Sequence, residues 1–253
     1  MTEARYAALY ELSSTHWWCQ GMQHVTRAIL EPLSNEKTLA RALDAGCGAG
    51  AATTWPQDQT QSVCLDLPTQ ALNSSRASSM NRFIAGSVER LPFADDTFDL
   101  ITMLDVLYHA GINDNEQALA EIWRVLRPDR WLLVRLPAFE WLRGPHDAAM
   151  GTQRRFTTRS AKRLLEDAGF AIQRATYANM WLFPVEAVWR LARRLLAGQH
   201  ERQHDAGDLF PVPTLLNQLL AGILKTEAHL LRRMNLPCGL SVLCLARKPA
   251  EDS

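Results

Sequence analysis

The chain has 253 residues, 47% of them hydrophobic, which is enough for one large domain with a sizeable core. Lys+Arg and Asp+Glu both number 27, and this zero net charge excludes a protein held to nucleic acid mainly by phosphate neutralisation. Five scattered cysteines without a Cys-x-x-Cys pair predict a reduced, cytoplasmic protein with no metal site. Neither a signal peptide nor a spanning apolar run is visible, so stable membrane insertion is not expected.

Strand and helix patterns alternate along the chain. Residues 3–31 read as a helix with a polar break, and an apolar run at 39–45 predicts the first strand. Further strands are predicted at 62–66, 82–85, 98–104, 131–136, 170–177 and 240–246, and further helices at 49–55, 68–79, 115–126 and 158–168. This order predicts an α/β fold: a doubly wound, Rossmann-like, seven-stranded and mostly parallel sheet with helices on both faces.

Residues 178–238 separate the sixth and seventh predicted strands, where a tight turn would suffice. They contain two amphipathic helices, so the predicted fold includes a helical insertion between strands 6 and 7. In the first helix, an apolar stripe through Val185, Val188 and Trp189 lies opposite Glu186 and Arg190. The predicted organisation is an N-terminal helical lid (1–37), a Rossmann-like core (38–177), the helical insertion or substrate lid (178–238), and a last strand with tail (239–253).

A glycine-rich turn follows the first predicted strand, in the segment LDAGCGAG at 43–50. Gly46 and Gly48 carry no Cβ, so backbone amides there can approach a ligand closely. Asp66 lies 20 residues beyond Gly46, at the tip of the second strand, where a carboxylate can accept hydrogen bonds from a ribose. The turn predicts a nucleoside-binding crevice, and by itself it also fits the looser fingerprint of a dinucleotide dehydrogenase.

Three later segments narrow this choice. Residues 86–99 (GSVERLPFADDTFD), 103–109 (MLDVLYH) and 121–128 (EIWRVLRP) resemble, in order and spacing, class I S-adenosylmethionine (SAM) methyltransferases of the bacterial type-11 group. The resemblance covers residues 38–177 and implies the fold and SAM as cofactor. It departs from the family at Ser87, where an aspartate is common, and at Asp129–Arg130, where two glycines are common.

The resemblance implies a role for each matching position. Cofactor contacts are expected from Asp44, Gly46, Cys47, Gly48, Asp66, Leu67, Ser87, Val88, Leu104 and Trp18. Within this set the glycine turn would line the methionine portion, Asp66 would take the ribose hydroxyls, and Ser87 would meet the adenine. The aromatic pair Trp17 and Trp18 would lie over the site.

Methyl transfer from a sulfonium needs alignment more than a dedicated base, because the leaving group is already activated. His109 and Tyr108 follow the fourth strand and are the candidate catalytic residues. His109 would act as a base or would brace its loop by hydrogen bonds. Tyr108 would shape the substrate mouth or simply pack.

Candidate substrate contacts lie outside the core motifs: Trp17, His146, Arg155, Trp181 and Glu227. Each has a structural alternative. Arg155 would bind an anionic substrate or form a surface salt bridge. Glu227 falls on an apolar stripe, so it would meet a substrate amine or an internal arginine.

The expected function is methyl transfer from SAM to a small-molecule acceptor, on an oxygen or nitrogen, in natural-product or glycan chemistry. A SAM-using cyclase and a non-catalytic, partner-binding member of the fold remain open alternatives. Besides the small molecule, two other partners are considered. One is a second copy of the chain, in a homodimer, and the other is a membrane surface that the arginine-rich inserted helix would contact. No nucleic acid is expected.

Overall fold

The computed structural model describes residues 15–35, 39–48, 61–67, 83–144, 147–148, 151–196 and 212–250. The predicted helices at 49–55 and 68–79 lie outside these ranges. In chain order the elements are α2 (Trp17–Leu30), η1 (Glu31–Asn35), β1 (Arg41–Ala45), β2 (Gln61–Asp66), β3 (Phe83–Ala85), β4 (Phe98–Leu104), α4 (Asn115–Val125), β5 (Leu126–Pro137), η2 (Glu140–Leu142), α6 (Thr158–Asp167), β6 (Ala171–Ala178), α7 (Phe183–Leu196), α8 (Thr214–Leu231) and β7 (Ser241–Arg247).

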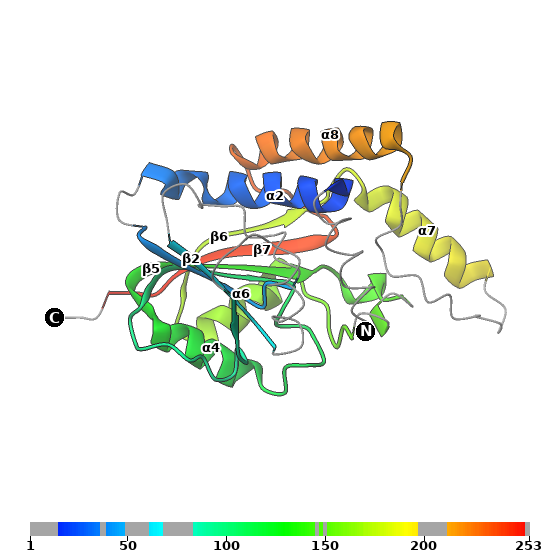
Figure 1. The fold of residues 1–253 in the computed structure, drawn as a ribbon. Helices are drawn as coiled ribbons and strands as arrows, with labels where there is room; N and C mark the ends of the chain where they lie inside the picture. Colours follow the sequence, from blue (N-terminus) through cyan, green and yellow to red (C-terminus); the bar gives the residue numbers. More distant parts are fainter. Residues whose placement is uncertain are drawn as a thin grey trace.

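A seven-stranded sheet in the order β3-β2-β1-β4-β5-β7-β6 runs through the middle of the fold (Figure 1). Strands β1 to β5 pair in parallel, whereas β7 is antiparallel to both β5 and β6. The predicted α/β class is confirmed. The strand order reverses between β1 and β4, so a crevice is expected at the carboxyl ends of these strands.

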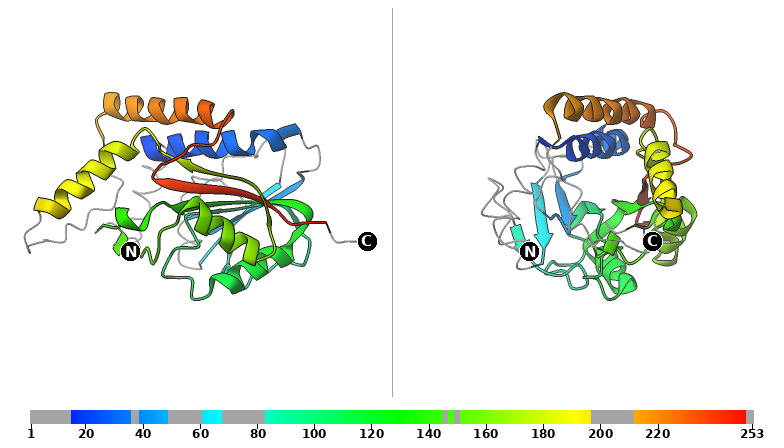
Figure 2. Two further views of the ribbon diagram at one scale, coloured as in Figure 1. Left: turned by 180° about the vertical axis from the view of Figure 1, so that it is seen from behind. Right: turned by 90° about the vertical axis from the view of Figure 1, so that its right-hand side faces the viewer.

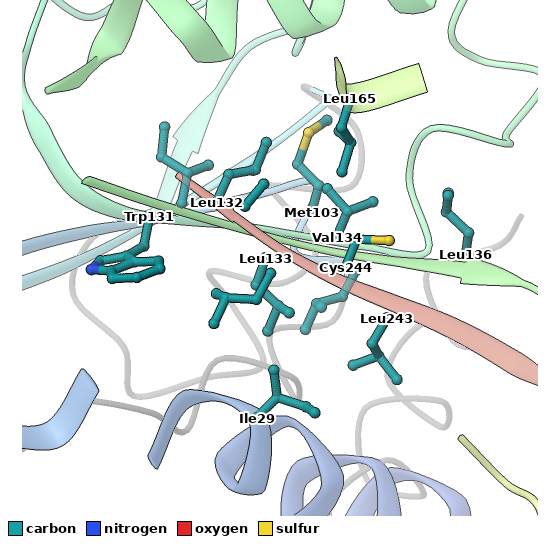
Figure 3. Packing of buried hydrophobic residues seen from close by; sticks show 14 of the residues in the cluster. Ile29, Met103, Trp131, Leu132, Leu133, Val134, Leu136, Leu165, Leu243 and Cys244 are labelled. Atoms are coloured by element: carbon teal, nitrogen blue, oxygen red, sulfur yellow. The ribbon is translucent and has the colours of Figure 1, made fainter. Parts of the chain in front are cut away.

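The two faces of the sheet are covered by different helices. Helices α4 and α6 lie on one face, and α2 and α8 lie on the other (Figures 1 and 2). Ile29 of α2 approaches the sheet from one side, near Leu133 and Leu243, while Leu165 of α6 lies on the opposite side (Figure 3). All four side chains are fully buried or nearly so. The central strands read as continuous apolar runs because both of their faces are covered.

Helix α2 and helix α8 pack closely although they are far apart in the sequence. A Cβ on Gly21 would lie 2.2 Å from Cδ1 and 2.6 Å from Cβ of Leu224, so only glycine allows this approach. The Asn217 side chain joins the helices again by accepting from the Trp17 amide and donating to the Thr15 carbonyl. The described part of the N-terminal segment is therefore a layer of the core, and its role as a lid stays a prediction.

Helix α7 has the predicted amphipathic period, and its apolar stripe faces outward. Val185, Val188 and Trp189 are exposed, and the polar side, with Glu186 and Arg190, is turned toward the protein. On this inner side Arg190 lies 3.5 Å from Asp147, so a charged pair rather than the apolar stripe meets the core there. Among the described residues, no helix is long and apolar enough to cross a membrane.

Candidate cofactor site

The glycine turn lies where the predicted crevice opens. Gly46 has a φ of 82° and Gly48 a φ of 56°, a region that costs glycine little. A Cβ on Gly46 would lie 2.5 Å from Cγ2 of Val106, so the turn and the loop after β4 approach one another closely. The amides of Gly46 and Cys47 both donate to the Leu65 carbonyl, which ties the turn to the end of β2.

The Asp66 carboxylate is held at the tip of β2 by backbone amides. One oxygen accepts from the Gly48 amide at 2.5 Å and the other from the Leu67 amide at 2.7 Å. Burial raises the pKa of Asp66 above its ordinary value, and these two hydrogen bonds only partly oppose that rise. Each carboxylate oxygen can accept a second hydrogen bond, so the group fits a ribose diol.

A cavity of about 180 Å³ opens beside this carboxylate. Seven of the predicted site residues line it: Gly46, Gly48, Asp66, Leu67, Ser87, Val88 and His109. The remaining lining residues are Leu65, Gly86, Asp105, Val106, Gly111 and Ile112. Motifs from four strand ends therefore meet around one hollow, which is the arrangement that a nucleoside needs.

Three predicted cofactor residues lie behind this lining. Asp44 is buried in β1 and accepts a hydrogen bond of 2.9 Å from the Thr102 hydroxyl. Cys47 is buried too, and a hydrogen bond with Cys64 together with burial raises the pKa of its thiol. Leu104 is also buried. These residues support the turn from beneath, and Cys47 has the character of a small packing residue rather than a nucleophile.

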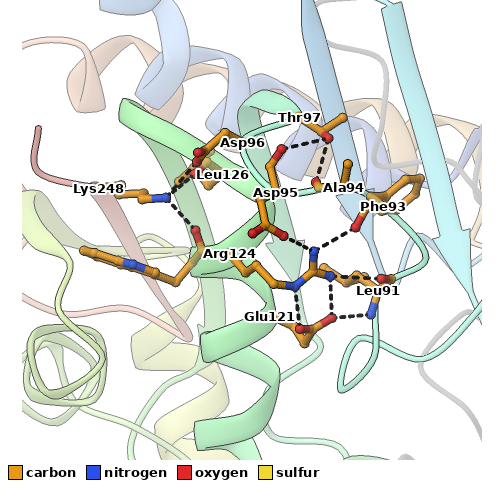
Figure 4. A network of polar contacts seen from close by, with 11 residues as sticks. Leu91, Phe93, Ala94, Asp95, Asp96, Thr97, Glu121, Arg124, Leu126 and Lys248 are labelled. Atoms are coloured by element: carbon orange, nitrogen blue, oxygen red, sulfur yellow. Dashed lines mark hydrogen bonds and ion pairs between the residues drawn. The ribbon is translucent and has the colours of Figure 1, made fainter. Parts of the chain in front are cut away.

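The segment that follows Ser87 is fixed by a polar network (Figure 4). Arg124 of α4 donates to both Glu121 oxygens, to Asp95, and to the carbonyls of Leu91 and Phe93. Glu121 in turn accepts from the Leu91 amide at 2.7 Å. The Glu-x-x-Arg spacing in the 121–128 segment thus clamps the loop that follows Ser87. The Ser87 hydroxyl itself accepts from the Glu89 amide.

Asp105 is a lining residue that the sequence reasoning did not assign. It follows β4 with a φ of 64°, and its carboxylate accepts from Arg135 of β5 at 2.8 Å. Burial lowers the pKa of Arg135, but the charge and hydrogen bond of the Asp105 carboxylate raise it, and the net pKa is raised. The guanidinium is therefore a fixed positive charge beside that carboxylate. A signal was present in the sequence, because Asp105 stands within the matched segment MLDVLYH at the end of a strand.

The two catalytic candidates lie on the loop after Asp105. His109 is exposed at the cavity, and its Nδ1 accepts a hydrogen bond of 3.0 Å from the Gly111 amide. In a neutral imidazole this leaves the proton on Nε2, so the lone pair that a base would use is engaged. This contact supports the bracing alternative. Tyr108 packs against the core, and burial, with Asp105 nearby, raises the pKa of its hydroxyl.

The predicted substrate residues do not gather at the cavity in the described structure. Arg155 is buried and forms an ion pair of 2.8 Å with Asp147. Glu227 is fully buried in α8, where its carboxylate accepts from the amides of Asn179, Met180 and Trp181. Backbone amides thus supply the partners that a substrate amine or an arginine was expected to supply. His146 lies outside the described residues.

The aromatic residues are divided between core and surface. Trp18 packs against the core, and its ring meets that of Trp17 edge-on at 5.7 Å. Trp181, two residues before α7, is exposed. Cys19, next to Trp18, lies near the Asp105–Arg135 pair, because both charges act on its thiol. The start of α2 therefore approaches the Asp105 side of the site.

The sheet order with an antiparallel β7, a glycine turn at the switch point and an acidic residue at the tip of β2 together define the class I methyltransferase fold. Residues 43–134 match the type-11 family described as "Methyltransferase domain". The match confirms the predicted class and, with it, SAM as the family's cofactor. The dinucleotide-dehydrogenase alternative falls away.

The individual curated relatives match only part of this chain. The chain is 30% identical over 142 residues to the ubiquinone/menaquinone biosynthesis C-methyltransferase of Vibrio campbellii. The aligned region covers 52% of this chain and 52% of that protein. It is 33% identical over 95 residues to a malonyl-[acyl-carrier protein] O-methyltransferase of Enterobacter lignolyticus, covering 36% of this chain and 37% of that protein. The chain thus spans about half the length, or less, of the curated relatives it matches.

A solved structure extends the likeness to the whole fold. A SAM-dependent methyltransferase of Thermotoga maritima is 15% identical, with a TM-score of 0.58, and the alignment covers 97% of this chain and 95% of that one. The [4+2]-cyclase SpnF is 21% identical with a TM-score of 0.51, covering 88% of this chain and 82% of that one. At these identities the likeness concerns the fold alone.

Proposed function

We propose that this protein transfers the methyl group of SAM to an oxygen or nitrogen of a small-molecule acceptor. The observation that carries the proposal is the Asp66 carboxylate, held by the Gly48 and Leu67 amides inside a cavity that Gly46 and Ser87 also line. A packed core alone has no need of a buried carboxylate at a strand tip or of open glycines beside it. Both are suited to a charged, ribose-bearing cofactor.

When bound, SAM supplies an electrophilic methyl group on a sulfonium. The protein's own residues would bind and orient it: Asp66 would accept from the ribose hydroxyls, Ser87 would lie toward the adenine, and the glycine turn, where a Cβ on Gly48 would meet nothing within 4 Å, would admit the methionine portion. Asp105 lines the cavity, and its carboxylate accepts a hydrogen bond from Arg135. It can orient or deprotonate an acceptor hydroxyl or amine, and Arg135 keeps it in place.

Incubation with SAM and sets of hydroxyl, amine and carboxylate acceptors, followed by mass spectrometry, tests the proposal. The expected products are S-adenosylhomocysteine and an acceptor heavier by one methyl group. Methylthioadenosine in place of S-adenosylhomocysteine would instead indicate the cyclase alternative. Bound SAM without turnover across the sets would support a non-catalytic partner-binding protein.

The compartment and the assembly are part of the same proposal. The five cysteines of the chain are free thiols in the structure, which fits work in a reducing compartment such as the cytoplasm. A homodimer would have to use a surface away from the cavity, and light scattering of the purified chain would measure it.

A further inference from the structure

Asp105 follows β4 in a backbone conformation that few residue types adopt readily. Its φ of 64° lies in the left-handed region, which costs free energy for a residue that carries a Cβ. The Asp105 amide donates to the Arg135 carbonyl at 3.0 Å, so the conformation is fixed by the neighbouring strand β5. Asp105 also lines the cavity beside Asp66. A residue held in this way at the cavity wall requires an explanation beyond packing.

Arg135 holds the Asp105 carboxylate through one of its two oxygens. The Nε and Nη2 atoms of Arg135 lie 2.8 Å and 2.6 Å from the same atom, Oδ2 of Asp105. The Asp105 side chain is 30% exposed, whereas that of Arg135 is only 9% exposed. The pair therefore has a buried cationic end and an open anionic end, and the open end belongs to the cavity wall.

Stability alone does not explain an arginine at this position. Residues 131–136 of β5 are all buried, and Arg135 is the charged member of an otherwise uncharged run. Removing a guanidinium from water has a large free-energy cost, and apolar residues of similar volume often stabilise a core as well as a buried ion pair does. The pair is better suited to fixing a carboxylate at the cavity than to stabilising the sheet.

Asp105 lies across the cavity from the predicted ribose site. Asp66 and Asp105 follow strands on either side of β1, and two strand spacings put these strand ends roughly 10 Å apart. With the ribose diol at Asp66, this separation suits the reacting end of the cofactor, where the sulfur on the ribose C5′ carries the methyl group. Among the described residues that line the cavity, none is a lysine or an arginine. The wall therefore offers no cationic partner to an anion.

We propose that Asp105, positioned by Arg135, binds the nucleophilic group of the methyl acceptor and selects acceptors with an O–H or N–H hydrogen. An ionised carboxylate accepts hydrogen bonds from hydroxyl and amine groups and repels another carboxylate. Asp105 therefore admits hydroxyl and amine acceptors and rejects carboxylates. Arg135 does not touch the acceptor and is a positioning residue. The inference rests on the proposed function, because SAM binding is what brings a methyl group to Asp105.

Sinefungin probes this position without turnover. It is an adenosyl amino acid with an ammonium-bearing carbon where SAM has its methyl sulfonium. The full-length chain is titrated calorimetrically with sinefungin and with S-adenosylhomocysteine, and the ratio of the two affinities is measured. The wild type should bind sinefungin at least about tenfold more tightly, because the ammonium meets Asp105. Asp105→Asn should bring the ratio to about one and change the affinity for S-adenosylhomocysteine by less than about threefold.

Matched variants separate this role from folding and from cofactor binding. Asp66→Asn should weaken both nucleosides and keep their ratio, and the exposed Asp167→Asn should change neither affinity. Asp105→Asn combined with Arg135→Met removes both charges, so no buried guanidinium is left unpaired, and should also abolish the preference for sinefungin. Arg135→Met alone should lower the ratio. Arg135→Lys should restore part of it, because lysine keeps the charge without the planar fork.

The possible results are distinct. An unchanged ratio in Asp105→Asn would overturn the inference. An equal loss of both affinities in that variant would also overturn it, because the carboxylate would then contact the amino-acid portion that both nucleosides share. A carboxylate acceptor that the wild type methylates would contradict the selection. Failure of the wild type to bind either nucleoside would overturn the proposed function itself, and this inference with it.

Discussion

At the scale of single residues, the burial of Asp66 predicts that SAM affinity depends on pH. The burial that raises the pKa of Asp66 means that its carboxylate gains a proton at a higher pH than an ordinary aspartate does. A protonated carboxyl loses part of its capacity to accept hydrogen bonds from ribose hydroxyls. We therefore expect SAM affinity to fall as the pH drops through this raised pKa, from neutral toward about pH 4.

Calorimetric titration at several pH values measures this effect. Asp66→Asn should bind SAM roughly tenfold to a hundredfold more weakly at neutral pH, because charge-assisted hydrogen bonds are lost. It should also lose the steep pH dependence. Asp167→Asn removes the same charge from an exposed position at the end of α6, away from the site, and serves as control. A wild-type affinity that does not change over this range would refute the assignment.

Glu227 gives the second prediction for a single residue. Its carboxylate accepts three amide hydrogen bonds, whereas a glutamine would turn a donating NH₂ group toward at least one of those amides. Glu227→Gln should lower the free energy of unfolding by about 1–3 kcal/mol and leave SAM affinity unchanged. Thermal unfolding checks it, with the exposed Glu166→Gln as control. An unchanged midpoint would contradict the capping role.

Residue identity predicted some of these roles better than others. The spacing from Gly46 to Asp66 carries chemical information, because an acidic residue about 20 positions after a glycine-rich turn is placed to meet a ribose. The stripe position of Glu227 shows only that a partner must exist. Its partners are backbone amides from residues about 47 positions away, and a sequence pattern does not identify backbone groups.

At the scale of elements, the contact between α2 and α8 depends on one glycine. Alanine is the better helix former by about 1 kcal/mol, so helix propensity alone would make Gly21→Ala stabilising. The Leu224 side chain occupies the position of the new methyl group, and we expect a net loss of about 1–3 kcal/mol. Adding Leu224→Ala should make the combined cost smaller than the sum of the two single costs. Urea unfolding of the wild type, the two single variants and the double variant measures these costs. Strictly additive costs would show that the helices do not pack as described.

Element limits were predicted closely where polarity changes sharply, as at β4, whose predicted range 98–104 matches the structure. Strand β5 begins five residues earlier than its apolar run, because Leu126 pairs with Phe98 across a break in register. The direction in which the apolar stripe of α7 faces was not predicted. Periodicity identifies the faces of a helix, but Asp147, far away in the sequence, determines which face turns inward.

At the scale of the whole molecule, the strand order creates the site. The ends of β1, β2 and β4 converge because the order reverses between β1 and β4, and each end carries one part of the cavity lining. This topology was predictable, since alternating strands and helices admit few arrangements. The joint layer of α2 and α8 was not, because the contact joins segments that no local pattern connects.

The most direct measurement is calorimetric titration of the chain with SAM, S-adenosylhomocysteine and NAD, repeated with Asp66→Ala. The structure and the family match predict that both sulfur nucleosides bind, that NAD does not, and that the Asp66→Ala variant binds at least about tenfold more weakly while remaining folded. Binding of NAD, failure to bind either sulfur nucleoside, or full affinity in the Asp66→Ala variant would contradict the assigned cofactor site.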